Sequence, residues 1–220
     1  MKHYFTVFGA TLLLFVIANP FVHAQTLITT YPSWNGSSGV GTWGSGTPVF
    51  GQTFTVPTDG NSVLTNFTFS VETVDGTDYQ AAVYAWDGSE ATGSALFSTS
   101  TLSLPGSFSF QTVNTDTGNL TLQAGQQYVA FFSYVSGAGG PVFGSPASSF
   151  ASFYDGGDFV STSGTITSTW SNTNGFGNHG DLAFNLNFTP APEPSTWVLM
   201  LGGLALMTIG RARQIRLKLR

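Results

Sequence analysis

Alternation of apolar and polar residues runs through the middle of the chain, between residues 27 and 190. In the clearest case, Leu182, Phe184, Leu186 and Phe188 are separated by single alanine or asparagine residues. A period of two places alternate side chains on opposite faces of a strand, so the pattern predicts strands with one buried face. The strands are predicted at 50–56, 66–71, 79–86, 95–101, 107–113, 119–122, 128–135, 149–154, 159–168 and 182–188.

The segment 128–135 differs from the others because it is apolar at successive positions as well as alternate ones. A strand that is apolar on both faces is typical of a central position in a sheet that is covered on both sides. We therefore expect 128–135 to lie centrally, with apolar side chains packed against each of its faces.

Turn residues separate these segments. Glycine follows aspartate, asparagine or proline at 75–76, 87–88, 105–106, 155–157 and 174–175, and such pairs supply the backbone angles that tight turns require. Roughly eight to ten short strands without helices predict an all-β fold, a two-sheet β-sandwich. Within that class we expect a jelly-roll-like topology, which is common in surface-binding domains of this size. Residues 25–190 suffice for one hydrophobic core.

The first 24 residues have the parts of a secretory signal peptide. Lys2 gives a positive start, residues 4–18 are apolar, and Val22-His23-Ala24 places small or modest residues at the cleavage positions. We expect export through the Sec machinery and cleavage by signal peptidase before Gln25. The alternative is an uncleaved membrane anchor, for which the apolar stretch is short against about 30 Å of hydrocarbon.

The last 30 residues hold a second apolar run with different flanks. Pro192-Glu193-Pro194 precedes a run at about 195–210, and a basic tail at 211–220 follows, with Arg211, Arg213 and Arg216. A buried core helix is the alternative for a run of this length. The absence of a polar stripe, the Pro-rich joint and the basic flank instead favour one short transmembrane helix whose tail stays cytoplasmic as an anchor.

The order of these three parts, with Gly202-Gly203 inside the apolar run, resembles the PEP-CTERM sorting signal over about residues 191–220. The resemblance implies a processing partner, an exosortase in the inner membrane, and a place among surface or matrix proteins of exopolysaccharide-producing bacteria. A looser similarity over Gln52 to Tyr134, including Val83-Tyr-Ala-Trp-Asp-Gly88, is to ectodomains of other exosortase-sorted proteins. That second similarity implies no activity.

Charge is segregated along the chain. Ten of the eleven acidic residues lie within 25–190, where there is no Lys or Arg, so this body carries a formal charge of −10. Nucleic-acid binding is excluded on this ground, because phosphate contacts need cations. The chain has no cysteine, which excludes disulfides and thiolate metal sites.

Catalytic signatures are weak. Gly39-x-Gly41-x-x-Gly44 matches a dinucleotide fingerprint in form, but no strand precedes it and no helix follows. A secreted hydrolase would need His179 beside a serine and an aspartate, or a carboxylate pair drawn from Glu72 and Glu90. We expect His179 to be a loop residue and the chain not to be an enzyme.

Two binding hypotheses remain. Trp34, Trp43 and Trp170 lie in Gly-, Ser- and Thr-rich segments, where exposed rings could stack on a sugar, whereas Trp86 at a strand end is expected to cap the core. The alternative for the three is that they close the rims of the sandwich. Calcium could be held by Asp75 and Asp78 or by Asp155 and Asp158, although ordinary turns explain these aspartates better and we expect no cofactor.

These features together predict an exported, acidic, non-enzymatic protein. It is expected to be anchored transiently in the inner membrane, and to end at the cell surface or in the extracellular matrix, associated with exopolysaccharide in a biofilm. The alternative functions are a carbohydrate-binding module that uses the loop tryptophans and, second, a secreted hydrolase.

Overall fold

The computed structural model describes residues 24–41, 43–44, 46–73, 76–137, 144–149, 151–172 and 180–191. The chain divides into two units, Met1–Pro190 and Ala191–Arg220. The predicted signal peptide, apart from Ala24, and the sorting signal from Pro192 onward lie outside the described residues. No helix among the described residues has the length and hydrophobicity needed to cross a membrane.

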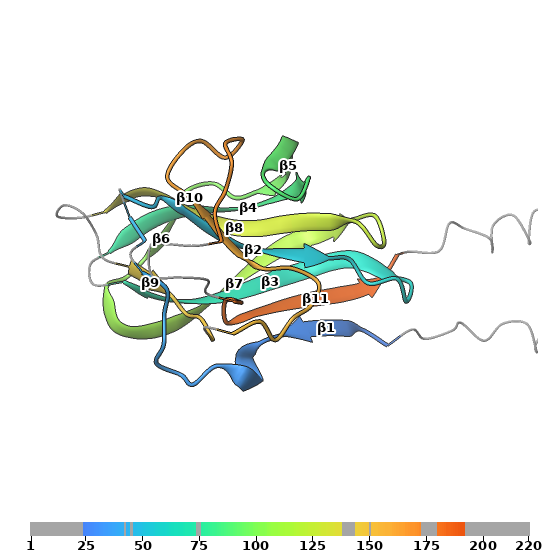
Figure 1. The fold of residues 1–220 in the computed structure, drawn as a ribbon, viewed down its shortest axis with the longest axis horizontal. Coiled ribbons are helices and arrows are strands. Elements are labelled where there is room, and N and C mark those ends of the chain that lie inside the picture. Colours follow the sequence, from blue (N-terminus) through green and yellow to red (C-terminus); the bar gives the residue numbers. More distant parts are fainter. Residues whose placement is uncertain are drawn as a thin grey trace, which may run out of the picture. The chain divides into compact units, whose positions relative to one another are not determined.

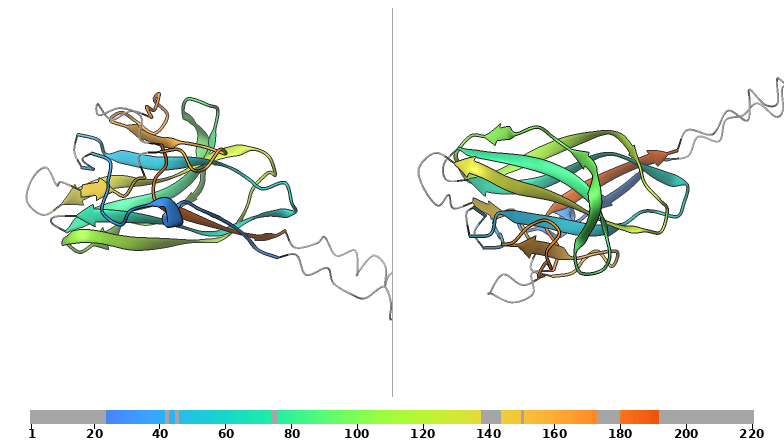
Figure 2. Two further views of the ribbon diagram at one scale, coloured as in Figure 1. Left: turned by 60° about the horizontal axis from the view of Figure 1, so that its bottom comes forward. Right: turned by 90° about the horizontal axis from the view of Figure 1, so that it is seen from above.

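The first unit is an all-β body of two antiparallel sheets, which confirms the predicted sandwich (Figure 1; Figure 2). A five-stranded sheet has the order β1-β11-β3-β7, and β9 also pairs with β3; a six-stranded sheet has the order β10-β2-β8-β4-β5, and β6 also pairs with β4. The strands are β1 (Thr26–Thr29), β2 (Val49–Thr55), β3 (Asn61–Thr73), β4 (Thr77–Trp86), β5 (Ala91–Ser98), β6 (Leu102–Leu104), β7 (Ser107–Thr121), β8 (Gln127–Gly137), β9 (Gly144–Pro146), β10 (Phe159–Thr162) and β11 (Phe184–Pro190), with a 3-10 turn η1 (Tyr31–Ser33) after β1.

The strands differ from the sequence prediction in several places, three of which change the count or extent of the predicted strands. The segments 107–113 and 119–122 belong to one strand, β7, in which Gly118 and Asn119 adopt positive φ at an irregularity in the pairing with β3. Only the start of 159–168 is a strand. The prediction of a strand at 149–154 is wrong for the described residues there, because the N–H groups of Phe153 and Tyr154 donate to the Asp181 side chain.

The main core lies between the two sheets. Period-two alternation along β8 sends Tyr128, Ala130 and Phe132 into this core, where Phe132 contacts the rings of Phe50 and Phe69. The intervening residues of β8 face the other way. Since β8 lies between β2 and β4 in its sheet, the prediction of a central strand covered on both faces is confirmed.

A second, smaller cluster covers the outer face of the six-stranded sheet. Val129 and Phe131 of β8 and Val160 of β10 pack there beneath Trp170, with Ile166 half-buried beside them. The close approach of Phe131 to β2 depends on Gly51, because a Cβ at that position would lie 2.7 Å from the Phe131 Cβ. The segment 163–172, which follows β10, is therefore folded back onto the sheet rather than left in solvent.

Candidate functional site

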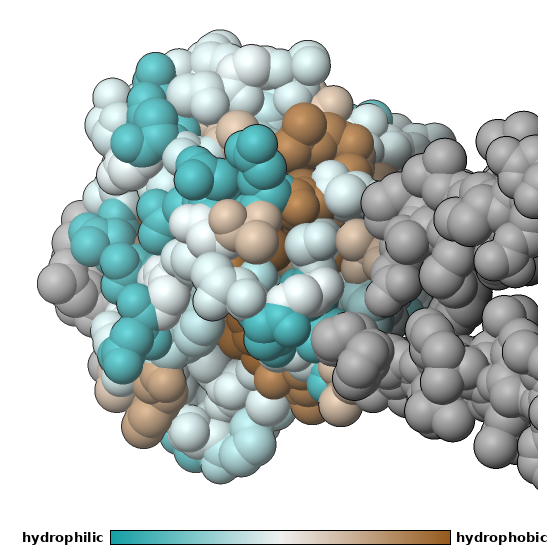
Figure 3. Space-filling view, turned by 90° about the vertical axis from the view of Figure 1, so that its right-hand side faces the viewer, coloured by the Kyte–Doolittle hydropathy of each residue, from teal (hydrophilic) through white to brown (hydrophobic). Residues whose placement is uncertain are grey.

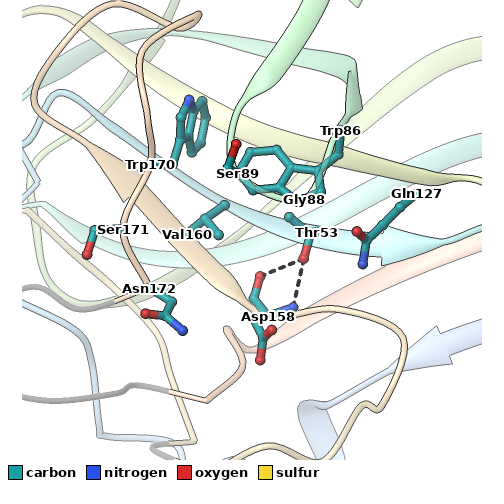
Figure 4. Close-up of a pocket in the computed structure, with 10 residues that line it drawn as sticks. All are labelled: Thr53, Trp86, Gly88, Ser89, Gln127, Asp158, Val160, Trp170, Ser171 and Asn172. Carbon is teal, nitrogen blue, oxygen red and sulfur yellow. Dashed lines mark hydrogen bonds between the residues drawn. The ribbon is translucent and has the colours of Figure 1, made fainter.

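A pocket of about 380 Å³ opens at one end of this outer face (Figure 4). Its volume lies in the lower part of the range for small-molecule sites, about 300–1,000 Å³. Ten residues from five separate chain segments line it: Thr53, Trp86, Gly88, Ser89, Gln127, Asp158, Val160, Trp170, Ser171 and Asn172.

Two indoles form one side of the pocket. Trp86 ends β4, and its ring meets that of Trp170 edge to face, with centroids 5.7 Å apart and an angle of 84° between the planes. Trp170 is held by its indole N–H, which donates to the Ile166 carbonyl at 2.7 Å, and by its backbone N–H, which donates to the Ser89 carbonyl at 3.0 Å. Trp170 is thus fixed by hydrogen bonds before any ligand arrives, and the Trp86 ring packs against it.

The opposite side carries Asp158, whose backbone is tied to β2. Thr53 donates its N–H to the Asp158 carbonyl at 2.9 Å, and its Oγ1 accepts the Asp158 N–H at 2.8 Å. These bonds use the Asp158 backbone, and Figure 4 shows the Asp158 carboxylate turned away from Thr53. The carboxylate is exposed at the rim, while Gln127 lies beside it half-buried.

The turn between β4 and β5 shapes the rim above the indoles. Asp87 accepts hydrogen bonds on Oδ1 from the N–H groups of Ser89 and Glu90 and from the Ser89 hydroxyl. These bonds, that from Glu90 first, lower the pKa of Asp87. The turn is therefore set by a local aspartate, and Ser89 is presented at the rim in one orientation.

The segment before Asp158 is held from within the sandwich by Asp181, which is fully buried. One carboxylate oxygen accepts the N–H groups of Phe153 and Tyr154 at 2.7 and 2.8 Å, and the other accepts from Nε2 of Gln52 at 2.9 Å. Desolvation outweighs these hydrogen bonds and raises the pKa of Asp181. The Tyr154 hydroxyl accepts the Thr55 N–H at 3.0 Å, which continues the attachment along β2.

This arrangement suits a polyhydroxylated ligand. Aromatic edges and faces contact the apolar side of a sugar ring, whereas amide, hydroxyl and carboxylate groups hydrogen-bond its hydroxyls. The pocket supplies both kinds of group from Trp86 and Trp170 on one side and Gln127, Asp158 and Asn172 on the other.

The three tryptophans proposed from the sequence are not brought together. Trp43 is 1% exposed and packs in the main core, where its indole N–H donates to the Pro48 carbonyl. Trp34 is half-buried against Phe110 of β7, on the other sheet. Trp170 is 6% exposed and lines the pocket. The three rings are therefore not exposed together on one face, because Trp43 and Trp170 are buried in different clusters.

Trp86 is the pocket residue that the sequence reasoning misplaced. It was expected to cap the core, but it packs against the outer cluster and lines the pocket. The alternation along β4 could have predicted this position. Tyr79, Ala81 and Val83 face the main core, and Trp86, an odd number of residues from each of them, faces the opposite side of the sheet.

The other candidate residues that the structure describes do not form a common site. Glu72 lies on β3 and Glu90 precedes β5, so the two belong to different sheets. His179 and Asp75 lie outside the described residues. Among the residues that are described, no group of three or more His, Cys, Asp or Glu could hold a metal ion. Asp78 accepts hydrogen bonds from Ser103 and Ser136, which lower its pKa.

Comparisons with protein-family models, with curated proteins and with solved structures return no match for this chain.

Proposed function

We propose that this chain is an exported, non-enzymatic protein of the cell surface or extracellular matrix. The observation that carries the proposal is the order of its segments, a signal-like start, an acidic body and a tail of PEP motif, apolar run and basic residues. The body between the two end segments has a core of its own, with every described strand between Thr26 and Pro190. A segment with its own core can fold without its flanks.

In this proposal the ends of the chain are addresses. The Sec machinery exports it, and the helix at about 195–210 holds it briefly in the inner membrane, with Arg211, Arg213 and Arg216 on the cytoplasmic side. An exosortase then acts near Pro192-Glu193-Pro194 and passes the body on. Because β1 and β11 pair antiparallel, with Thr26 opposite Phe188, both ends of the body leave it at one end. At that end the visible hydrophobic side chains gather in separate areas among hydrophilic ones (Figure 3).

We further propose that the sandwich is a jelly roll. Chain-adjacent strands β1, β2, β3 and β4 alternate between the sheets, and the later strands β7, β8 and β11 insert beside them. The resulting orders, β1-β11-β3-β7 and β2-β8-β4-β5, are those of two interleaved Greek keys. β10 extends the second sheet beyond β2.

The processing proposal predicts a defined mature chain. Mass spectrometry of protein recovered from the native host is expected to find a product that starts at Gln25 and ends near Pro194, outside the membrane fraction. Changing Pro192, Glu193 and Pro194 to alanine is expected to leave the tail attached and the protein in the membrane fraction. A wild-type chain that retains Trp197 to Arg220 in the inner membrane would contradict the proposal.

A second function, carbohydrate binding by the body, is favoured by the pocket. The pocket pairs two packed indoles with amide and carboxylate groups at a suitable volume. Of the three tryptophans proposed from the sequence, only Trp170 belongs to this site, and Trp86 joins it.

Loss of the Trp86 ring is expected to weaken retention of the body on host exopolysaccharide by up to about tenfold, since stacking on a sugar is worth about as much as other aromatic contacts, about 0.5–1.5 kcal/mol. Affinity electrophoresis of residues 25–190 measures this for Trp86→Ala. Trp34→Ala is the matched control, because Trp34 is also half-buried but lies against the other sheet. Equal retention of both variants and wild type would count against this pocket.

A further inference from the structure

The charges around the pocket have one sign. Asp158 is the single charged residue among the ten that line it. Asp87 and Glu90 flank the rim residues Gly88 and Ser89, and Asp155 precedes Asp158 by three positions. The chain has no Lys or Arg between residues 3 and 210, so no lysine or arginine of the body can balance these carboxylates.

A second carboxylate, that of the buried Asp181, interacts electrostatically with Asp158. The charge of Asp158 is one of the causes that raise the pKa of Asp181, although a smaller one than desolvation. The two carboxylates therefore repel each other, and Asp181 also holds the segment 153–158 through the backbone N–H groups of Phe153 and Tyr154. An anionic group that entered the pocket would meet the carboxylate of Asp158 at the rim.

A ligand with a cationic group meets the opposite situation. A protonated amine beside Asp158 would form a charge-assisted hydrogen bond, which is stronger than a neutral one. The faces of Trp86 and Trp170 attract cations as well, through the quadrupole of the indole ring. The Asn172 amide and the acceptor oxygens of Gln127 and Ser89, whose donors already bond Gly156 and Asp87, can bind neutral hydroxyls of the same ligand.

We propose that this pocket selects glycans by charge, binding amino-bearing sugars most tightly, neutral sugars less tightly, and excluding sugars that carry carboxylates, with Asp158 as the selecting residue. The inference rests on the carbohydrate-binding function proposed above and names the substrate class of that site. It implies that the partner polysaccharide of this acidic body is neutral or partly deacetylated at amino sugars, rather than a uronic acid polymer.

The test uses three β-1,4-linked oligosaccharides of equal length that share a glucose backbone. One is the unmodified oligomer, one has free amines at C2, and one has carboxylates at C6. Each is titrated at mildly acidic pH into residues 25–190, with binding followed by calorimetry and by the NMR signals of the indole N–H groups. Asp158→Asn is compared with Asp155→Asn, which makes the same change of net charge on the same exposed segment outside the pocket lining.

Wild type is expected to bind the amino oligomer about twofold to fivefold more tightly than the neutral one, because an ion pair at an exposed carboxylate strengthens binding by about that factor. That preference should shrink as salt is added, since exposed charges are screened. Asp158→Asn is expected to remove the preference and to leave neutral binding within about twofold of wild type. Asp155→Asn is expected to retain most of the preference.

Three other results of these titrations would each overturn part of the proposal. Equal losses in the two variants would show that the charge of the whole body, and not Asp158, attracts the amine. Binding of the carboxylated oligomer as tight as that of the neutral one would overturn the charge selection alone. If none of the three oligomers shifts an indole signal, the carbohydrate-binding function of the pocket fails, and the selection fails with it.

Discussion

Replacing Asp181 with alanine is expected to lower the free energy of unfolding of the body by about 3 kcal/mol, because each buried donor left without a partner costs about 1–3 kcal/mol. The change removes the acceptor of two such donors, the N–H groups of Phe153 and Tyr154, and one of the two acceptors of Gln52 Nε2, which also donates to the Thr53 carbonyl. Relief of the buried charge offsets part of this loss. Chemical denaturation of residues 25–190 measures the difference.

The control is Asp155→Ala, which removes an exposed aspartate two residues beyond Phe153 and should change stability by about 0.5 kcal/mol or less. Asp181→Ala should also weaken glycan binding, since Asp181 holds the segment that carries Asp158. A variant as stable as wild type would show that the segment 151–158 is held by other contacts, such as that of Tyr154 with Thr55.

The raised pKa of Asp181 adds a pH dependence of definite sign. A carboxyl whose folded pKa lies above its unfolded value, about 3.9, binds its proton more tightly in the folded state. Its contribution to stability is thus fully present below the unfolded pKa and is lost as pH rises through the raised folded pKa. Asp181→Asn lacks this group, so the stability of wild type relative to the variant is expected to increase as pH falls.

The local alternation of apolar and polar residues was sufficient to predict the fold class. Each strand buries one face, and the period of two identifies the side chains on that face. The same pattern predicted that 128–135 would be covered on both sides, and the outer cover proved to be the segment with Trp170. The short strands β1, β6 and β9 escaped prediction. Three or four residues hold too little alternation, and these strands are defined by their partners β11, β4 and β3.

The pocket could not be predicted from local pattern, since its sides come from segments far apart in sequence. A glycine-rich context suggested that Trp43 would be exposed, yet glycines also let backbones approach closely. The backbone N–H of Trp43 donates to the Gly144 carbonyl at 2.6 Å, and a Cβ at Gly144 would lie 3.1 Å from the Trp43 ring. Glycine content alone therefore does not distinguish a loop that leaves the body from one that folds back into it.

Glycine content is equally ambiguous at Asp155-Gly156-Gly157. The two glycines predicted a turn, but the local sequence does not show why residue 157 must be glycine. A Cβ on Gly157 would lie 1.9 Å from the carbonyl oxygen of Thr53 and 2.4 Å from its carbonyl carbon. Thr53 is more than 100 positions away in the chain, so nothing near Gly157 in sequence could reveal this contact. The structure assigns to Gly157 the close approach that lets the segment before β10 lie along the edge of β2.

Gly157→Ala is therefore expected to lower the free energy of unfolding by about 3 kcal/mol, the upper part of the range for overpacking a closed site. The added Cβ meets backbone atoms of Thr53, which no side-chain rotation can move, so the three hydrogen bonds between Thr53 and Asp158 must lengthen or break. Gly46→Ala is the matched control, because a Cβ there has no atom within 4 Å, and it should change stability by about 1 kcal/mol or less. Thermal unfolding followed by circular dichroism compares the two variants with wild type.

Displacement of Asp158 should also weaken binding of the amino oligomer by Gly157→Ala, even at temperatures where the variant remains folded. Equal stability of the two alanine variants would contradict the role given to Gly157, since only one of them has a backbone in its way.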